Sequence, residues 1–191
     1  MVELPASAAW RHRDARDGFE VVFLHREPDG YRFAGHASAV EERVAWAVRY
    51  AISVDLSWAT RSAHVVAESE LGAREAQLET NGVGAWRVDG RPAPELAGCS
   101  DVDLEASAFT NAFPIHRLAL PDLQRADAPA AYVRAPGLAV ERLEQSYARL
   151  PDEGRHARYD YASPAFDFRA ALVYDASGLL LDYPGLAVRV T

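Results

Sequence analysis

Apolar and polar residues alternate with a period of two along much of the chain, and the longest such run covers residues 44–58. Every even position there carries a large apolar residue, whereas the odd positions carry mostly alanine or serine. Successive side chains of a strand point to opposite faces, so the run predicts one strand, or two collinear ones, with the even residues inward. At ~3.3 Å per residue it would span roughly 50 Å, and we expect it to curl or carry a bulge.

Shorter apolar runs lie on both sides of this segment, separated by Asp-Gly, Asn-Gly and Leu-Gly pairs that are typical of hairpin turns. Residues 140–150 fit a helix and a strand equally, because apolar residues recur there at both spacings. The sequence predicts a single all-β domain over residues 1–191, with at most one short helix, as an antiparallel barrel, roll or sandwich. The strands expected around the long run cover residues 19–25, 31–38, 64–71, 74–80, 84–88, 113–120, 131–134, 166–175, 179–183 and 186–190.

Charge and composition narrow the partners that this chain could have. The net charge is −8, and all 20 basic residues are arginine. An acidic chain without a basic cluster is a poor match for nucleic acid or an anionic membrane surface. The lack of lysine removes the Walker-type phosphate loop and covalent pyridoxal phosphate attachment, and we expect no cofactor. No apolar run approaches the ~18 residues that membrane insertion needs. One cysteine and an N-terminus without a signal-peptide pattern favour a cytoplasmic location.

Polar groups gather in mid-chain, within residues 84–120. Asp101 and Asp103 share one side if this part is extended, and we expect one of them to be buried against an arginine, with Arg117 the first choice. The two carboxylates could also contact a ligand, or act as a general acid and base as in glycoside hydrolysis. Asn111 could bind a sugar hydroxyl, although capping of a turn is the commoner use of asparagine. Asp55 is expected to pair with Arg61 or Arg49.

Aromatic side chains are open to two interpretations as well. Trp58 and Trp86 could stack on a sugar or line an acyl pocket, but tryptophan on a strand is more often part of the core. The same ambiguity applies to four tyrosines: Tyr147, Tyr159, Tyr161 and Tyr183. Cys99 is expected to be a small buried residue rather than a nucleophile. The six histidines show no ligand spacing, so we expect no metal site, and no residue is assigned a catalytic role.

Short motifs spread over most of the chain resemble one known family. They are Tyr50-x4-Asp55-x2-Trp58, Gly84-x-Trp86-x2-Asp89-Gly90, Gly98-Cys99-x-Asp101-Val102-Asp103, Phe109-Thr110-Asn111, Gln145-x-Tyr147-x-Arg149-Leu150 and Asp182-Tyr183-Pro184-Gly185. Together they resemble the bacterial putative glycolipid-binding proteins. The resemblance implies a strongly curled antiparallel sheet, a spiral β-roll or open barrel similar to the folds of bacterial lipoprotein carriers. Two departures from the family pattern are Ala108 in place of proline and His116 in place of arginine. No catalytic residue of the family can be carried over.

These observations favour a binding protein whose curled sheet encloses a partly apolar cavity for an amphipathic ligand, a lipid or glycolipid. The expected contact residues are Trp58, Trp86, Asp101, Asp103, Asn111, Arg117 and Tyr147. One alternative is a hydrolase that uses Asp101 and Asp103, although the sequence leans away from an enzyme. Another is a structural or interaction protein with a filled core.

Overall fold

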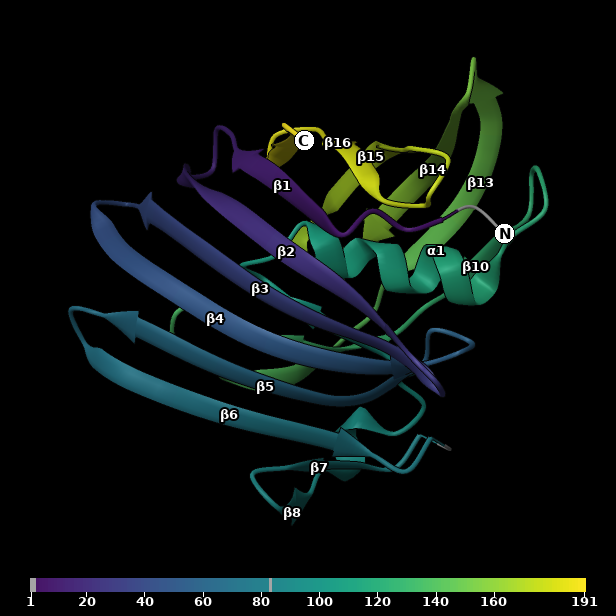
Figure 1. The fold of residues 1–191 in the computed structure, drawn as a ribbon. Helices are drawn as coiled ribbons and strands as arrows, with labels where there is room; N and C mark the ends of the chain where they lie inside the picture. The colour runs from purple at the N-terminus through teal and green to yellow at the C-terminus, as the bar shows by residue number, and fades with distance from the viewer. Residues whose placement is uncertain (1–2, 83) are drawn as a thin grey trace.

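The computed structural model describes residues 3–82 and 84–191, which are almost entirely β-structure around one short helix. Fourteen strands form one open, curled sheet in which all neighbours are antiparallel, and β10 and β8 are its edges (Figure 1). In spatial order they are β10 (Arg125–Asp127), β13 (Ser146–Glu153), β14 (His156–Ser163), β15 (Phe168–Tyr174), β16 (Leu180–Tyr183), β17 (Ala187–Arg189), β1 (Ser7–His12), β2 (Asp17–Glu27), β3 (Gly30–Glu41), β4 (Val44–Asp55), β5 (Thr60–Ser69), β6 (Gly72–Thr80), β7 (Trp86–Val88) and β8 (Arg91–Pro92). The spiral β-roll predicted for the chain is confirmed.

The two ends of the described chain lie side by side in the middle of this sheet. Strand β1 pairs with β2 on one side and with β17 on the other, so that Trp10 lies opposite both Glu20 and Arg189. The first half of the chain therefore builds one wing of the sheet, from β1 to β8. The second half builds the other wing, from β17 to β10.

Strand β4 confirms the predicted alternation over residues 46–54, but Leu56, which was also expected to face inward, is 57% exposed. Its even residues from Trp46 to Val54 are buried, while Ala45, Ala47 and Arg49 are exposed. The strand stops at Asp55, three residues short of the predicted end. The Asp55 carboxylate explains this, because its Oδ1 accepts hydrogen bonds from the backbone N–H groups of Ser57 (2.8 Å) and Ala59 (3.0 Å) and so closes a turn. The expected pairing of Asp55 with Arg61 or Arg49 is wrong, since Arg61 bonds to Asp29 instead.

The turn after β4 has a twin between β15 and β16. There the Asp175 Oδ1 accepts from the backbone N–H groups of Ser177 (2.8 Å) and Leu179 (3.0 Å). The fourth residue of each turn is left-handed, with φ of 69° at Trp58 and 73° at Gly178. Glycine is the usual residue for that conformation, so the first twin holds a tryptophan in a strained position.

A short helical segment fills the space that the curled sheet encloses. It consists of η2 (Phe109–Asn111) and α1 (Ala112–Leu118), and we call residues 109–118 the plug. The strand expected over residues 113–120 is therefore wrong. Pro114 lies in the first turn of α1, where proline is tolerated because the N–H groups there have no partner within the helix. Phe109 and Phe113, four residues apart, pack on Phe33 with ring centroids 4.8 and 5.6 Å away.

Three strands form a second, smaller sheet beside the plug. Strand β11 (Ala130–Val133) runs parallel to β9 (Asp101–Leu104) and antiparallel to β12 (Val140–Leu143). The ambiguous residues 140–150 are thus strand, divided between β12 and β13, and not a helix. All four residues of β9 are buried, which fixes the acidic pair in the interior. Two single 3-10 turns, η1 (Pro94–Leu96) and η3 (Pro164–Phe166), complete the described elements.

Candidate functional site

Two cavities open at opposite ends of the plug. The smaller one, of about 270 Å³, lies beside Asn111 where the plug begins, and we call it the tyrosine pocket. The larger one, of about 1170 Å³, lies beside Ile115, His116 and Ala119 where the plug ends. None of the inward residues of β4, all of which the structure describes, lines either cavity, so the single cavity predicted behind this strand is not found there.

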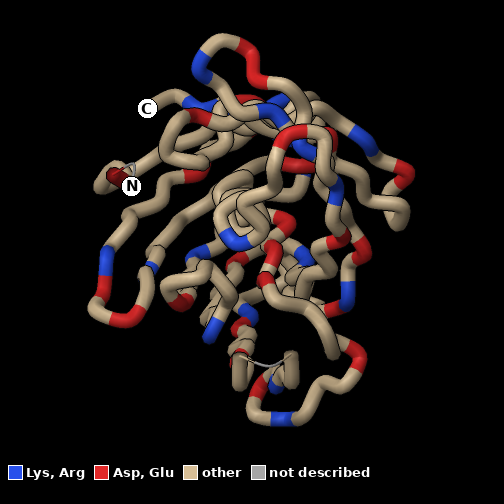
Figure 2. The backbone as a smooth tube through the Cα atoms, turned by 90° about the vertical axis from the view of Figure 1, so that its right-hand side faces the viewer, with Lys and Arg blue, Asp and Glu red and all other residues tan. Residues whose placement is uncertain are grey.

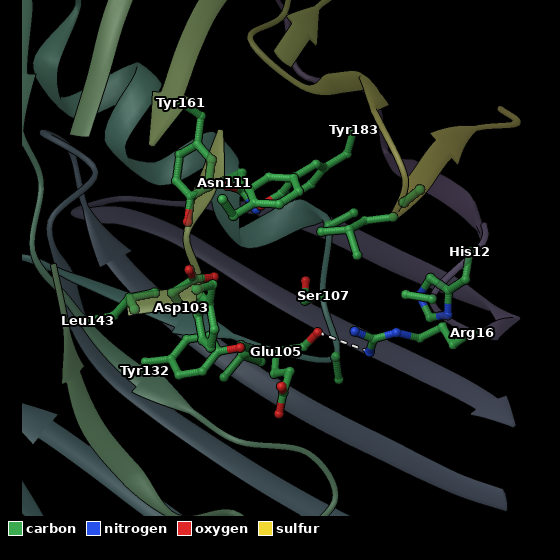
Figure 3. A pocket seen from close by; sticks show the side chains of 18 of the residues that line it. His12, Arg16, Asp103, Glu105, Ser107, Asn111, Tyr132, Leu143, Tyr161 and Tyr183 are labelled. Carbon is green, nitrogen blue, oxygen red and sulfur yellow. Dashed lines mark hydrogen bonds between the residues drawn. The ribbon is translucent and has the colours of Figure 1, made fainter. Parts of the chain in front are cut away.

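Three tyrosines from three different strands give the tyrosine pocket its name (Figure 3). Tyr132 comes from β11, Tyr161 from β14 and Tyr183 from β16. The rings of Tyr161 and Tyr183 meet edge to face, with centroids 6.0 Å apart. Phe168 packs 6.2 Å from Tyr161, and Phe166 packs 5.7 Å from Tyr132. The pocket therefore has an aromatic wall that carries hydroxyl groups.

Asp103 supplies a carboxylate to the same pocket. Its Oδ1 accepts a hydrogen bond of 2.7 Å from the hydroxyl of Thr110, and the residue is only 8% exposed. Burial raises the pKa of Asp103 to about 6, and the charges of Asp101 and Glu105 act in the same direction. In Figure 3 this carboxylate and the Tyr161 hydroxyl point toward each other. The pocket thus contains a strong acceptor whose charge is poorly solvated.

The opposite end of the tyrosine pocket carries donors. The Arg16 guanidinium donates a hydrogen bond of 3.1 Å to the backbone carbonyl of Glu105 (Figure 3). It also lies 5.4 Å from the centre of the Trp46 ring. His12 is buried beside it, and its pKa is lowered to about 4, first by burial and then by the charge of Arg16. The imidazole of His12 is therefore neutral at physiological pH.

Glu20, which was not among the predicted site residues, holds the start of the plug against the sheet. Its carboxylate accepts hydrogen bonds from the hydroxyls of Tyr50 (2.5 Å) and Ser107, and from the backbone N–H groups of Ala108 (2.7 Å) and Phe109 (3.3 Å). Burial raises the pKa of Glu20 above its ordinary value. A signal was present in the alternation of β2, because Glu20 occupies an inward position, in line with the buried Val22 and Leu24.

The other member of the acidic pair is structural. Asp101 is 1% exposed and accepts two hydrogen bonds from the Arg117 guanidinium, of 2.9 and 2.6 Å. This confirms the expected carboxylate–arginine pair. It also removes Asp101 and Arg117 from the candidate contact residues, because neither lines the two cavities. The hydrolase alternative needs both carboxylates in one cavity, and only Asp103 is there.

The remaining sequence candidates divide between cavity and core. Asn111 lines the tyrosine pocket, but its Oδ1 accepts a hydrogen bond of 3.0 Å from the Tyr147 hydroxyl, so its expected turn-capping role is wrong. Tyr147 itself is fully buried behind it. Trp86 is a core residue whose indole N–H donates to the Cys99 carbonyl at 3.0 Å. Trp58 lines the larger cavity and stacks on His116, with ring centroids 3.6 Å apart.

Other kinds of site find little support in residues 3–82 and 84–191. No group of three histidine, cysteine, aspartate or glutamate side chains in these ranges could hold a metal ion. No helix within them is long and apolar enough to cross a bilayer. Burial raises the pKa of the Cys99 thiol to about 11, which leaves it protonated and unreactive. In Figure 2 the arginines are scattered among acidic residues rather than gathered in one cluster.

Comparisons with known proteins agree with the fold. A crystal structure of a DUF1089 family protein from Pseudomonas aeruginosa superimposes with a TM-score of 0.75 and is 36% identical in sequence. The match covers 90% of this chain and 92% of that one. No curated protein matched the chain. The family described as "Putative glycolipid-binding" matches residues 7–189. Since this range includes both wings of the sheet, the plug and the whole tyrosine pocket, we conclude that the chain belongs to the putative glycolipid-binding family.

Proposed function

We propose that the tyrosine pocket binds the hydroxyl-rich head group of an amphipathic ligand, such as the sugar of a glycolipid. The observation that carries the proposal is the buried Asp103 carboxylate facing a wall of three tyrosines. Sugar hydroxyls are donors that match a carboxylate acceptor, and the apolar face of a sugar ring packs well on aromatic side chains. Apolar walls with a few convergent polar groups are the usual form of a small-ligand site.

The size of the pocket supports a head group rather than a whole lipid. At about 270 Å³ it is just below the range of roughly 300–1,000 Å³ that holds drug-sized ligands. One sugar ring is the scale of ligand that fits. The apolar part of the ligand would leave past Phe166, which also lines the pocket. Phe166 is 42% exposed, so an alkyl chain could cover it there. A ligand made and used in the cytoplasm fits the expected location of the protein.

A panel of methyl and octyl glycosides tests this function by saturation-transfer NMR and calorimetric titration. We expect saturable binding, with octyl glycosides tighter than methyl glycosides. Asp103→Asn should weaken binding at pH 7.5 by about tenfold, the order expected when a charge-assisted hydrogen bond becomes a neutral one. Trp58→Phe is the matched control, because it changes an aromatic side chain in the other cavity, and it should leave the affinity unchanged. Binding that is equal in the Asp103→Asn variant, or absent throughout the panel, would refute the proposal.

A further inference from the structure

Arg16 differs from the other well-buried arginines that form ion pairs. Its side chain is 9% exposed, yet its nearest carboxylate oxygen, on Glu41, is 3.8 Å away. Arg117 has a carboxylate oxygen at 2.6 Å, and Arg189, which is 11% exposed, has one at 3.0 Å. The one short hydrogen bond described for Arg16 goes to a backbone carbonyl, which carries no net charge. A buried guanidinium is normally compensated by a close carboxylate, so much of the Arg16 charge is left uncompensated.

His12 stands beside Arg16 in the same wall. The residue is 6% exposed and lines the tyrosine pocket, but its Nδ1 is buried without a hydrogen-bond partner in the described chain. An unsatisfied buried polar atom costs about 1–3 kcal/mol and is uncommon in a native structure. Figure 3 shows His12 and Arg16 together at one end of the pocket, with Asp103 and Tyr161 at the other. The poorly compensated charge of Arg16 and the His12 Nδ1 that lacks a partner among the described residues therefore lie together in one wall of the pocket, and the fold alone explains neither.

We infer that the His12–Arg16 end of the tyrosine pocket binds an anionic group carried by the head group, a phosphate or a carboxylate. This inference rests on the proposed function. The anion would accept hydrogen bonds from the Arg16 guanidinium and from the imidazole of His12, while the hydroxyl groups of the same ligand face Asp103. Arginine suits this role, because its planar fork matches both phosphate and carboxylate. The ligand class is a hydroxyl-rich ring with one acidic substituent.

The acidic groups nearby do not block an anion at this end. The Glu105 carboxylate is already engaged, since it accepts a hydrogen bond of 2.7 Å from the Ala135 N–H and lies 3.6 Å from Arg134. The Asp103 carboxylate lies at the far end of the pocket in Figure 3. Glu41 is the direct competitor, but its side chain is 36% exposed and can turn to water. We therefore treat Glu41 as a weak occupant of the place that the ligand anion would take.

Matched sugars separate the contribution of the anion from that of the ring. The probes are methyl glucoside, glucuronate, glucose 6-phosphate and inorganic phosphate, each titrated calorimetrically at pH 7 and constant ionic strength. At least one acidic sugar should bind ten or more times as tightly as methyl glucoside. The stronger of the two acidic sugars identifies the acidic substituent. Inorganic phosphate alone should bind more weakly than glucose 6-phosphate, because it makes no contact with the aromatic wall.

Three variants test the residues. Arg16→Gln should remove most of the preference for the acidic sugar, and Glu41→Gln should increase its affinity several-fold by removing the competitor. Arg13→Gln is the control, because Arg13 carries the same charge three residues away but bonds to Asp182 outside the pocket. This variant should keep the wild-type preference for the acidic sugar. Since Glu41 is partly exposed, its variant remains informative even if Arg16→Gln fails to fold.

The outcomes distinguish this inference from the proposed function. Equal affinity for neutral and acidic sugars would overturn the anion site and leave the head-group pocket standing. An acidic preference that survives Arg16→Gln, or that Glu41→Gln reduces, would also overturn the anion site. Failure of every sugar to bind would overturn both proposals.

Discussion

Asp103 should make the protein less stable as the pH rises through the weakly acidic range. Its pKa increases from the ordinary 3.8 to about 6 in the folded chain. Between these values the folded state holds a proton that the unfolded state has lost, so the free energy of unfolding falls as the pH rises. At about 1.4 kcal/mol per pH unit, the loss is about 3 kcal/mol by pH 7, with no further loss above it.

The Asp103→Asn variant isolates this contribution. The free energy of unfolding is measured by urea titration from pH 4 to pH 8, with the fluorescence of the four tryptophans as the signal. Any fixed cost of burying the amide is independent of pH, and other buried carboxyls titrate in both proteins. The difference between variant and wild type should therefore rise by roughly 2.4 kcal/mol between pH 4 and pH 7, the part of the total that falls within this range. Asp127→Asn, at an exposed position, is the control. A difference for Asp103→Asn that stays constant across this range would refute the assignment.

Three further predictions concern the supports of the plug and the twin turns, each measured by urea unfolding. Glu20→Gln should destabilise the protein by about 2–4 kcal/mol, because it breaks a buried network of four hydrogen bonds, and a loss under 1 kcal/mol would contradict the anchoring role. Arg117→Met should cost about 3–5 kcal/mol by leaving the Asp101 charge uncompensated, and adding Asp101→Asn should recover much of this loss. Gly178→Ala should cost more than Gly185→Ala, because both residues have positive φ but only a Cβ at position 178 would meet an imidazole, at 2.6 Å. Equal losses for the two glycines would mean that the ring moves aside freely.

The sequence predicted the sheet better than the segment that fills it. Strand β4 was readable because its inward and outward residues differ at nearly every position. The plug was not, because its buried residues include Ala112, Phe113, Pro114 and Ile115 in succession, with no polar face to show a helical period. Strand β9 was not readable either, because all four of its residues are buried and no polar face marks the strand period. The alternation of apolar and polar residues indicates which residues face water. Few residues of the plug and none of β9 are even partly exposed, so neither segment shows a clear pattern.

The candidate site shows a similar division. The Asp101–Arg117 pair was predictable, since a buried charge requires a partner of opposite sign nearby. Asp103 and Asn111 were both expected to contact a ligand, and both line the tyrosine pocket. Tyr132 reaches this pocket from a predicted strand and His12 from a strand that was not predicted, and neither residue was a candidate. Their positions depend on how β1 and β11 are placed by the whole sheet, and local spacing carries no such information.

The Glu20 anchor also constrains how the chain can fold as it is synthesised. The backbone N–H of Ala108 that Glu20 binds lies 88 residues further along the chain. At ~5–20 residues per second, translation needs roughly 4–18 seconds to deliver it. Until then the Glu20 carboxylate has the Tyr50 hydroxyl as a partner in the first wing, but it lacks the donors of Ser107, Ala108 and Phe109. We expect this wing to remain loosely structured on the ribosome until the plug has left the exit tunnel, so that anchoring of the plug and consolidation of the sheet become a single step.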